Sequence, residues 1–473
     1  MRLATAAPAA MGVDPAALAR TLTELAAQGT ELHGIVVLRH GRVIMSGEAD
    51  PWTPDQIRLV YSLSKTFCSA AVGIAVDQGC FGYEDRVVDL LADQVDDRVG
   101  ELARQIRVRD LLAMASGHEQ DLIMDIGQRG LAEADLGWFL RIEPTGIPGR
   151  TFCYNQLCTW TLSRLVARYA GADVLELLTR HVFGPLRVDS GYWARDCDGL
   201  PLGFSGLHIS TATVAAFFQL LADGGIHHGV RLLPAAWISE HSRTQVETLP
   251  AGAAGDPVGD WALGYGWQVW RSRHGYRGDG AFGQYGMVLP EQDLVVAITS
   301  WSPDLQVTMD VIWSELLPGV DREPTPGGDQ ALAQALAGLK VPTAGTGWPE
   351  QPATAGWSGS DNHGNHLSLT ADTDQASLDW TDDTGARHQL VAGPDTWLPG
   401  RLAWDERWLA VATSAGYGPD GWRLRMAILH TPHLVTWTLP TGSCQATIAW
   451  SEEPLGWQRI HQLAQPFPLD NGI

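Results

Sequence analysis

Hydrophobic and polar positions divide the first two thirds of the chain into three blocks. A helical pattern over 14–28 leads into a β-hairpin that turns at Gly41-Arg42. Small and apolar residues from Ser62 to Val76 then predict a buried helix that Gly79 ends. Residues 80–240 are mostly helical in pattern, strand patterns return at 265–272, 282–290 and 293–301, and a short helix follows at 307–317. Strands on both sides of a helical block predict an α+β domain, with the late strands completing the sheet begun by the hairpin.

The last third has a different pattern. Residues 318–360 are rich in Pro, Gly and Thr and hold one short helical stretch, which predicts a linker. About eight short strand candidates follow between His366 and Ser451, separated mostly by Gly, Pro or Asp, and they predict a lipocalin-like antiparallel β-barrel. The predicted division is therefore a domain over 1–320, a linker over 321–360 and a barrel domain over 361–473. Ten of the 20 tryptophans lie in 346–473. We interpret them as core and rim residues, with a ligand mouth lined by tryptophan as the alternative.

The charge argues against two classes of partner. With 32 Lys and Arg against 54 Asp and Glu, the formal net charge is −22, which disfavours nucleic acid and anionic membrane surfaces. No window approaches 18 apolar residues, so we expect no membrane span. The first 20 residues predict a helix start at Asp14-Pro15 and not a signal peptide, and the six cysteines contain no C-x-x-C pair. We therefore expect a cytoplasmic protein with free thiols, and a homo-oligomer is compatible with the sequence.

The candidate chemistry begins with the S-x-x-K motif of Ser62 and Lys65. Arginine occurs 30 times and lysine only at Lys65 and Lys340, so a lysine in this position needs an explanation. Three residues apart on a helix, the two side chains share one face. Burial lowers the pKa of a lysine, and a neutral amine beside a serine hydroxyl can activate it as a nucleophile. The alternative is an ordinary helix cap with a surface lysine.

A second motif contains Tyr154 and Gln156. A Pro148-Gly149 turn precedes Tyr154, and a helix begins just after it. A phenol beside an ammonium ionises more easily, so Tyr154 could exchange protons with Ser62 and a leaving group. Gln156 could bind a substrate carbonyl or hold Lys65. Taken alone, Tyr154 would be interpreted as a half-buried core residue.

A third motif, over 276–284, contains glycines in a G-x-G-x-x-G spacing at Gly278, Gly280 and Gly283. A strand follows it and not a helix, so we reject a dinucleotide site. Glycines on a strand instead allow a ligand to approach the backbone closely, and an edge strand can donate an N–H to an oxyanion.

The three motifs together, in this order, resemble the β-lactamase/penicillin-binding-protein superfamily, and its class C β-lactamase, S12 peptidase and esterase branch most closely. The resemblance covers about residues 5–320. It implies a serine acyl-enzyme mechanism in which Ser62 is the nucleophile, Lys65 its activating partner and Tyr154 the general base and acid. It also implies an oxyanion hole made by the backbone N–H of Ser62 and one N–H from 277–279, with Gln156, Arg277, Gly278 and Asp279 as the substrate-binding residues.

Two departures from the superfamily bear on the substrate. Its Y-x-N motif appears as Tyr154-Asn155-Gln156, one methylene longer, and its K-T-G motif is absent. Arg277, Arg273 and His274 are the candidates to take the place of that lysine, although a rigid, planar guanidinium does not reproduce the compact charge of an ammonium. Among the superfamily's activities, we therefore favour an esterase or amide hydrolase acting on small molecules. The alternatives are a β-lactamase, a D,D- or D-amino peptidase, an acyltransferase, or a non-catalytic binding protein.

The remaining motifs and histidine pairs give weaker evidence of function. The chain has neither a G-x-S-x-G nor an H-E-x-x-H motif. His363 with His366, and His430 with His433, could converge on a metal, but loop histidines are the commoner explanation. His118 could line the cleft or only shape a turn. We expect neither a metal nor an organic cofactor.

Overall fold

The computed structural model describes residues 3–123, 136–189, 191–248, 259–345, 347–351, 355–456 and 459–467. It divides into two compact units. The first unit contains Met1–Gly47 and Leu59–Gly338, and the second contains Glu48–Arg58 and Leu339–Ile473. The second unit thus takes a short segment from the early part of the chain, which no local pattern indicated.

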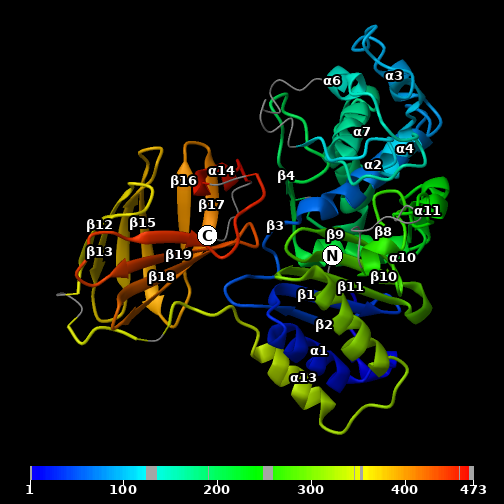
Figure 1. The fold of residues 1–473 in the computed structure, drawn as a ribbon. Helices are drawn as coiled ribbons and strands as arrows, with labels where there is room; N and C mark the ends of the chain where they lie inside the picture. Colours follow the sequence, from blue (N-terminus) through cyan, green and yellow to red (C-terminus); the bar gives the residue numbers. More distant parts are fainter. Residues whose placement is uncertain are drawn as a thin grey trace. The chain divides into compact units, whose positions relative to one another are not determined.

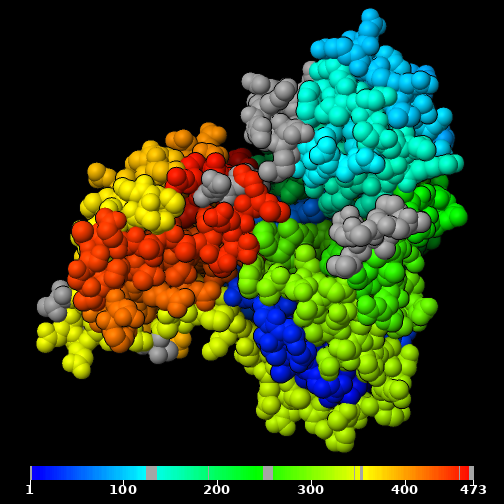
Figure 2. All heavy atoms as spheres, viewed as in Figure 1, coloured from blue at the N-terminus to red at the C-terminus, as the bar shows by residue number. Residues whose placement is uncertain are grey.

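This division differs from the expected boundaries at 320 and 361. Helix α13 (Gly328–Ala337) packs against α1 (Pro15–Ala27), so it belongs to the first unit and not to a linker (Figures 1 and 2). Asp14 caps α1 and also accepts hydrogen bonds from the backbone and hydroxyl of Thr325, at 3.0 and 2.6 Å. The early segment joins the second unit because Trp52 donates its indole N–H to the Leu429 carbonyl, at 3.2 Å.

A six-stranded sheet forms the centre of the first unit, in the order β2-β1-β11-β10-β9-β8. Its strands are β1 (Glu31–Arg39), β2 (Arg42–Glu48), β8 (Trp270–Ser272), β9 (Gly275–Gly280), β10 (Gln284–Leu289) and β11 (Leu294–Trp301). The late strands join this sheet through the pairing of β11 with β1, as the sequence pattern predicted. Almost every residue of β1 and β11 is buried, because α1 covers one face and α10 (Thr211–Ala222) the other.

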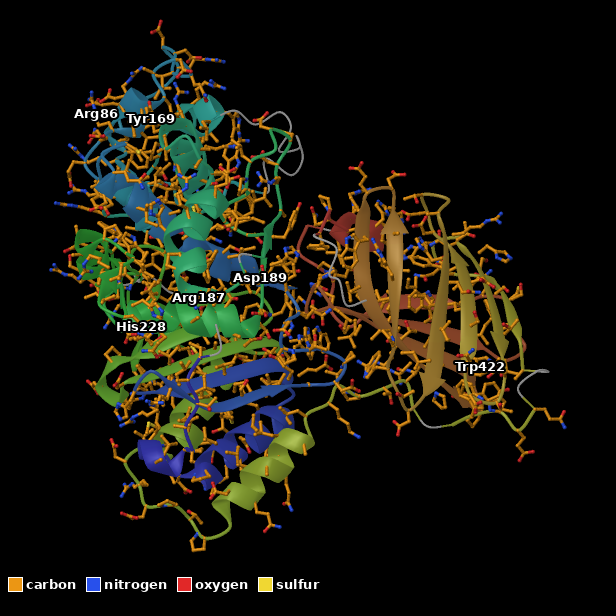
Figure 3. All side chains as sticks on the ribbon, turned by 180° about the vertical axis from the view of Figure 1, so that it is seen from behind. Arg86, Tyr169, Arg187, Asp189, His228 and Trp422 are labelled. Atoms are coloured by element: carbon orange, nitrogen blue, oxygen red, sulfur yellow. The ribbon has the colours of Figure 1, made fainter. Side chains whose placement is uncertain are left out.

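Helices inserted between β2 and β8 form much of the remainder of the first unit (Figure 1). They are α2 (Ser64–Asp77), α3 (Val87–Leu90), α4 (Val108–Leu112), α6 (Leu136–Arg141), α7 (Gln156–Tyr169), α8 (Val174–Leu178), α9 (Gly184–Leu186), α10 and α11 (Ala235–His241). Helix α2 is buried from Ser64 to Ala75 and packs against α7. At the far end of α7, Tyr169 donates its hydroxyl to the Leu90 carbonyl at 2.5 Å (Figure 3). Two short strands, β4 (Tyr192–Trp193) and β5 (Leu207–Ile209), lie in the same region.

Gln268, on the segment before β8, ties three of these helices together. It is buried, and its backbone adopts a left-handed φ of 61°. Its amide nitrogen donates to the carbonyls of Leu111 and Leu112, and its amide oxygen accepts from Thr159 on α7 at 2.7 Å. Its own carbonyl accepts from Thr66 on α2 at 2.8 Å. The loop before β8 therefore fixes α2, α4 and α7 relative to one another.

The second unit is a curled sheet of nine strands (Figure 1). They are β12 (Trp357–Ser360), β13 (His366–Ala371), β14 (Ala376–Thr381), β15 (Arg387–Pro394), β16 (Leu398–Trp404), β17 (Arg407–Gly418), β18 (Gly421–Ile428), β19 (Leu434–Pro440) and β20 (Thr447–Trp450). Most of its described tryptophans are buried, as a core interpretation predicts; Trp422 is one of them (Figure 3).

The second unit differs from the expected antiparallel barrel in two respects: its sheet does not close, and one of its strand pairs is parallel. The first and last strands approach through one parallel bridge, Ser360 with Gln445, and not through a ladder. Strands β15 and β17 also pair in parallel, over Gly393 and Pro394, where proline has no N–H to extend the ladder. The sheet therefore curls without closing.

Within the part of the chain that the structure describes, no helix is both long enough and apolar enough to cross a membrane.

Replacing Gln268 tests its role in joining the helices. In Gln268→Ala, the carbonyls of Leu111 and Leu112 lose the side-chain donor and the buried Thr159 hydroxyl loses its acceptor, so we expect the free energy of unfolding to fall by about 1–3 kcal/mol. Urea titration measures it. The control is Gln78→Ala, whose exposed amide contacts His181; it should change stability by less than about 0.5 kcal/mol. Equal effects of the two variants would contradict this role.

Candidate active site

Ser62 lies on a tight turn just before α2. The predicted helix starts two residues later than Ser62, at Ser64, after a single 3-10 turn over Tyr61–Leu63. Tyr61 has a left-handed φ of 47°, which is unusual for a residue with a side chain, and its ring packs edge-on against Phe282 at 5.1 Å. Ser62 is half-buried, whereas its neighbours on both sides are buried. The turn therefore presents this serine to solvent from an otherwise closed segment.

Backbone contacts with β5 hold this turn in place. The N–H of Val60 donates to the Leu207 carbonyl at 2.9 Å. The N–H of Leu207 donates in return to the Ser64 hydroxyl at 3.1 Å, and that hydroxyl donates to the Tyr61 carbonyl. A strained backbone persists only where its surroundings enforce it, and such strain concentrates at functional sites.

Lys65 lies beside Ser62 and is 1% exposed. Its Nζ donates to the Ser62 hydroxyl at 2.9 Å and to the Phe204 carbonyl at 2.8 Å. Burial lowers the pKa of Lys65 to about 7, although the carboxylates of Asp121 and Asp279 act in the opposite direction. Near neutral pH, a substantial fraction of this amine is therefore uncharged.

Tyr154 completes the cluster from the N-terminal end of α7, where Asn155 caps the helix. Its hydroxyl is hydrogen-bonded to Ser62, and Lys65 Nζ lies 4.8 Å from the centre of its ring. The ring stacks on Trp270 at 5.4 Å. Burial raises the pKa of Tyr154, and the nearby Asp279 carboxylate adds to that shift. This phenol therefore stays protonated at neutral pH.

A cavity of about 240 Å³ opens beside these residues. It is lined by Ser62, Tyr154, Trp261, Trp270, Asp279, Gly280, Ala281 and Leu305. The cavity therefore combines the serine hydroxyl, three aromatic rings, one carboxylate and the end of strand β9.

The glycines of β9 allow that strand to lie against the serine turn. A Cβ on Gly280 would come 2.2 Å from the Val60 carbonyl oxygen, and one on Gly278 would come 2.4 Å from the Thr66 hydroxyl. The register of β9 with β8 ends at Arg277. The backbone beyond Arg277 therefore continues past its neighbouring strand, toward the cavity that Gly280 and Ala281 line.

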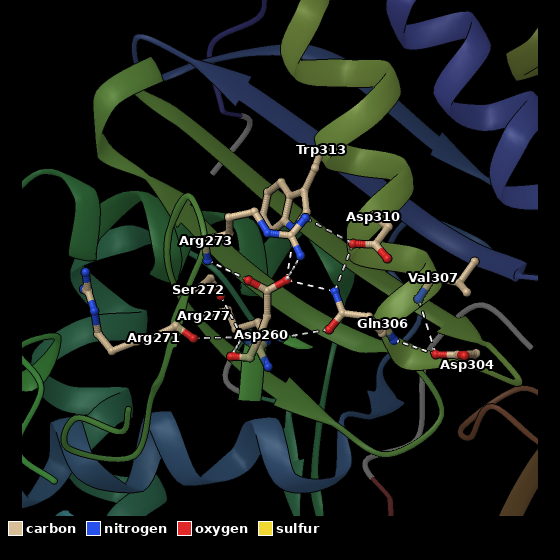
Figure 4. A network of polar contacts seen from close by, with 10 residues as sticks. All are labelled: Asp260, Arg271, Ser272, Arg273, Arg277, Asp304, Gln306, Val307, Asp310 and Trp313. Atoms are coloured by element: carbon tan, nitrogen blue, oxygen red, sulfur yellow. Dashed lines mark hydrogen bonds and ion pairs between the residues drawn. The ribbon is translucent and has the colours of Figure 1, made fainter. Parts of the chain in front are cut away.

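Arg277 and Asp279 have different environments from those expected. Arg277 is 0% exposed and does not line the cavity. Its guanidinium donates to Ser272 and to the carbonyls of Arg271 and Asp260 (Figure 4). Its Nε donates to Asp279. Arg277 Nη2 has no hydrogen-bond partner among the described residues, but the side chain is 0% exposed and does not reach the cavity. The expectation that Arg277 takes the place of the K-T-G lysine at the substrate is therefore not met by its position. Asp279, two residues on, lines the cavity instead.

The other expected residues lie near the cluster without lining the cavity. Gln156 starts α7, and its side-chain oxygen is buried without a hydrogen-bond partner in the described part of the chain. Gly278 packs against α2. His118 is buried, and its ring bonds Ser116 and the Ile142 carbonyl, which favours the turn interpretation.

Sequence reasoning missed several participants. Trp261 and Trp270 line the cavity, Phe204 binds Lys65, and Asp121 accepts the N–H of Gln156 at 3.1 Å and raises the pKa of Lys65. These residues come from separate segments of the chain, one of them strand β8, so no spacing in the sequence connects them to Ser62.

Among the described residues, no group of three or more His, Cys, Asp and Glu side chains could hold a metal ion. His430 and His433 are both buried in the second unit, with ring contacts to Phe467 and Trp450. The candidate histidine pairs therefore gain no support from the structure.

The comparison with known families covers this same unit. A family model described as Beta-lactamase matches residues 18–312, well over half of the chain. The chain belongs to the beta-lactamase family. The fold expected for the first unit is confirmed: it combines a sheet with helices, as in the family, and it carries Ser62, Lys65 and Tyr154.

Individual relatives of this beta-lactamase family member are distant. A 6-aminohexanoate-dimer hydrolase of Paenarthrobacter ureafaciens is 23% identical over 327 residues, covering 62% of this chain and 81% of the relative. The solved structure of a penicillin-binding protein homologue from Caulobacter crescentus is 15% identical, with a TM-score of 0.51, and covers 64% of this chain and 99% of its own. The structural likeness establishes the fold alone.

Adding a methyl group to Gly280 tests the close approach of β9 to the serine turn. Gly280→Ala places a Cβ against a backbone oxygen that cannot move aside, so we expect a loss of about 1–3 kcal/mol in the free energy of unfolding, measured by urea titration. Gly418→Ala, on β17, is the matched control, because its Cβ would meet no atom within 4 Å. A Gly280→Ala variant as stable as the control would show that β9 does not pack as described.

Proposed function

We propose that this protein is a serine hydrolase that cleaves small esters or amides through an acyl-Ser62 intermediate. The observation that carries the proposal is the contact of a buried lysine amine with a half-exposed serine hydroxyl, 2.9 Å apart, beside a cavity. Membership of the beta-lactamase family and the hydrolase named among its relatives support the same class.

The pKa shifts divide the proton transfers between Lys65 and Tyr154. Burial makes neutral Lys65 accessible near pH 7 and keeps Tyr154 protonated. Lys65 therefore accepts the Ser62 proton as the serine oxygen attacks the substrate carbonyl carbon. Tyr154 lines the cavity together with Ser62, so its hydroxyl relays the proton held by Lys65 to the leaving group as the carbon–leaving-group bond breaks. Water then attacks the acyl-enzyme and restores Ser62; an alcohol or amine that replaced water would receive the acyl group instead.

The developing negative charge on the carbonyl oxygen needs backbone donors. Along a strand, alternate residues direct their N–H groups to the same edge. Arg277 is the last residue of β9 that pairs with β8, so the N–H groups of Asp279 and Ala281 follow it at an edge that β8 no longer covers. We assign the oxyanion hole to the N–H of Ser62 and one from 279–281, which moves the expected site along the strand by two residues.

The alternatives of a β-lactamase or D,D-peptidase are less favoured. Substrates of those enzymes carry a carboxylate, and none of the described residues that line the cavity is cationic. A non-catalytic binding protein would have no use for a lysine whose pKa is lowered beside a serine.

Covalent labelling tests the nucleophile. A fluorophosphonate should add one adduct to the wild type, detected by intact mass, and none to Ser62→Ala. Ser239→Ala, on the surface helix α11, should label like the wild type. A folded wild type that takes no adduct, or labelling that survives in Ser62→Ala, would refute the assignment.

The pH dependence of labelling identifies the base. Only neutral Lys65 accepts a proton, so the labelling rate should rise with pH through an apparent pKa of about 7 and become constant above it. Tyr154→Phe should lower the rate by about 100-fold or more yet keep the same midpoint. A rate that instead rises only toward the ordinary range of a tyrosine would make Tyr154 the base and contradict the proposed roles.

A further inference from the structure

The cavity beside Ser62 has an unusual lining for a site that binds polar substrates. Three aromatic side chains, Tyr154, Trp261 and Trp270, form its walls, and Asp279 is the one carboxylate among the described residues that line it. Aromatic faces carry partial negative charge and attract cations, most strongly when the cation is desolvated. Walls of this kind together with a carboxylate favour a positively charged ligand group.

The Asp279 carboxylate has one oxygen in use and one available. Oδ2 accepts from Arg277 Nε at 3.0 Å and from the Trp261 indole N–H at 3.1 Å. Oδ1 has no hydrogen-bond partner among the described residues, and the Asp279 side chain keeps 10% exposure where it lines the cavity. An ammonium or N–H donor in the cavity would therefore meet an acceptor already held in place.

Arg277 positions this carboxylate without presenting its own charge to a ligand. Its guanidinium lies 4.6 Å from the centre of the Trp261 ring and is closed off by Ser272 and the carbonyls of Arg271 and Asp260. The pair with Asp279 lowers the cost of burying the carboxylate, because an opposite charge favours its ionised form. Burial is the larger effect and raises the pKa of Asp279, with Arg277, Trp261 and Lys65 opposing it.

A second buried carboxylate fixes the wall that carries Trp261. Asp260 accepts from the N–H of Arg273, from Gln306 and from Trp313, at 2.6, 2.8 and 3.2 Å (Figure 4). Burial acts to raise the pKa of Asp260, but these hydrogen bonds outweigh it and hold the pKa below its ordinary value. Trp261 is the next residue, so the network that holds Asp260 also sets the place of the indole that contacts Asp279.

We propose that this cavity is a subsite for a substituted ammonium group, so that the preferred substrates are small esters or amides that carry a positively charged amine close to the scissile carbonyl. Asp279 Oδ1 accepts a hydrogen bond from a protonated amine and lies against the charge of a quaternary ammonium. The rings of Trp261 and Trp270 enclose the alkyl groups on the nitrogen. The proposal rests on the proposed function for the reaction but concerns which substrates Ser62 meets. A cavity of about 240 Å³ holds a small group of this kind and not a whole drug-sized ligand.

Protection of Ser62 from labelling tests the subsite with three matched probes. Choline is cationic, 3,3-dimethylbutan-1-ol is its neutral counterpart of nearly the same shape, and 3,3-dimethylbutanoate is anionic. We expect choline to halve the fluorophosphonate labelling rate at a concentration at least tenfold lower than the neutral alcohol, and the anion to protect least. Equal protection by choline and the alcohol, or stronger protection by the anion, would overturn the proposal.

Asp279→Asn is the variant that assigns the preference to this carboxylate. It keeps the side-chain shape and removes the charge, so the ratio between choline and the alcohol should fall toward one. Asp89→Asn removes an exposed carboxylate on α3, remote from the cavity, and should keep the wild-type ratio. A ratio that survives in Asp279→Asn contradicts the proposal. If loss of the Arg277 partner prevents this variant from folding, Trp270→Leu tests the aromatic wall in its place, with the same expected fall.

Calorimetric titration with choline separates this inference from the proposed function. A wild type that is not labelled but binds choline, with weaker binding in Asp279→Asn, would refute the hydrolase and retain the ammonium subsite. A wild type that is labelled at Ser62 but binds choline no better than the neutral alcohol would retain the hydrolase and refute the subsite.

Discussion

The burial of Lys65 is the constraint on which the site depends. An ammonium is costly to bury without a carboxylate partner, and among the described residues Nζ of Lys65 is hydrogen-bonded only to a serine hydroxyl and a backbone carbonyl. Its environment therefore favours the neutral amine, which is what a serine nucleophile needs. Helix α2 can hold the lysine there because its first three turns are enclosed by α7 and by the segment that Gln268 anchors.

Strand β9 forms another wall of the cavity, and it can lie close to Ser62 because glycines stand at the contact. Gly278 and Gly280 let the strand touch α2 and the serine turn, and the residues between and beside them face the other way. One of these, Arg277, is enclosed by polar groups of the sheet, and the other, Asp279, reaches the cavity. The strand therefore contributes a carboxylate to the cavity where its own arginine would have contributed a cation, and this reversal of charge distinguishes the cavity more than the cluster of Ser62, Lys65 and Tyr154 does.

The candidate site belongs to only one of the two units. The family match and the whole candidate site fall within the first unit. The second unit is a curled sheet with a core of tryptophans. It also includes the segment Glu48–Arg58, whose two end residues form a buried ion pair. Because the second unit combines Glu48–Arg58 with Leu339–Ile473, two parts far apart in the sequence, its boundaries could not follow from composition alone.

Short-range patterns determined much of this protein. The spacing of Ser62 and Lys65, the Tyr154 motif at a helix start and the strands that flank a helical block were all legible in the sequence, because each depends on contacts within a few residues or on a family pattern in a fixed order. The tertiary structure alone decided that Arg277 turns inward while Asp279 lines the cavity, that Trp261, Trp270 and Asp121 join the site, and that the second sheet curls without closing. Those outcomes depend on strand register and on loops far apart in the chain, whose packing is settled only when the whole core is assembled.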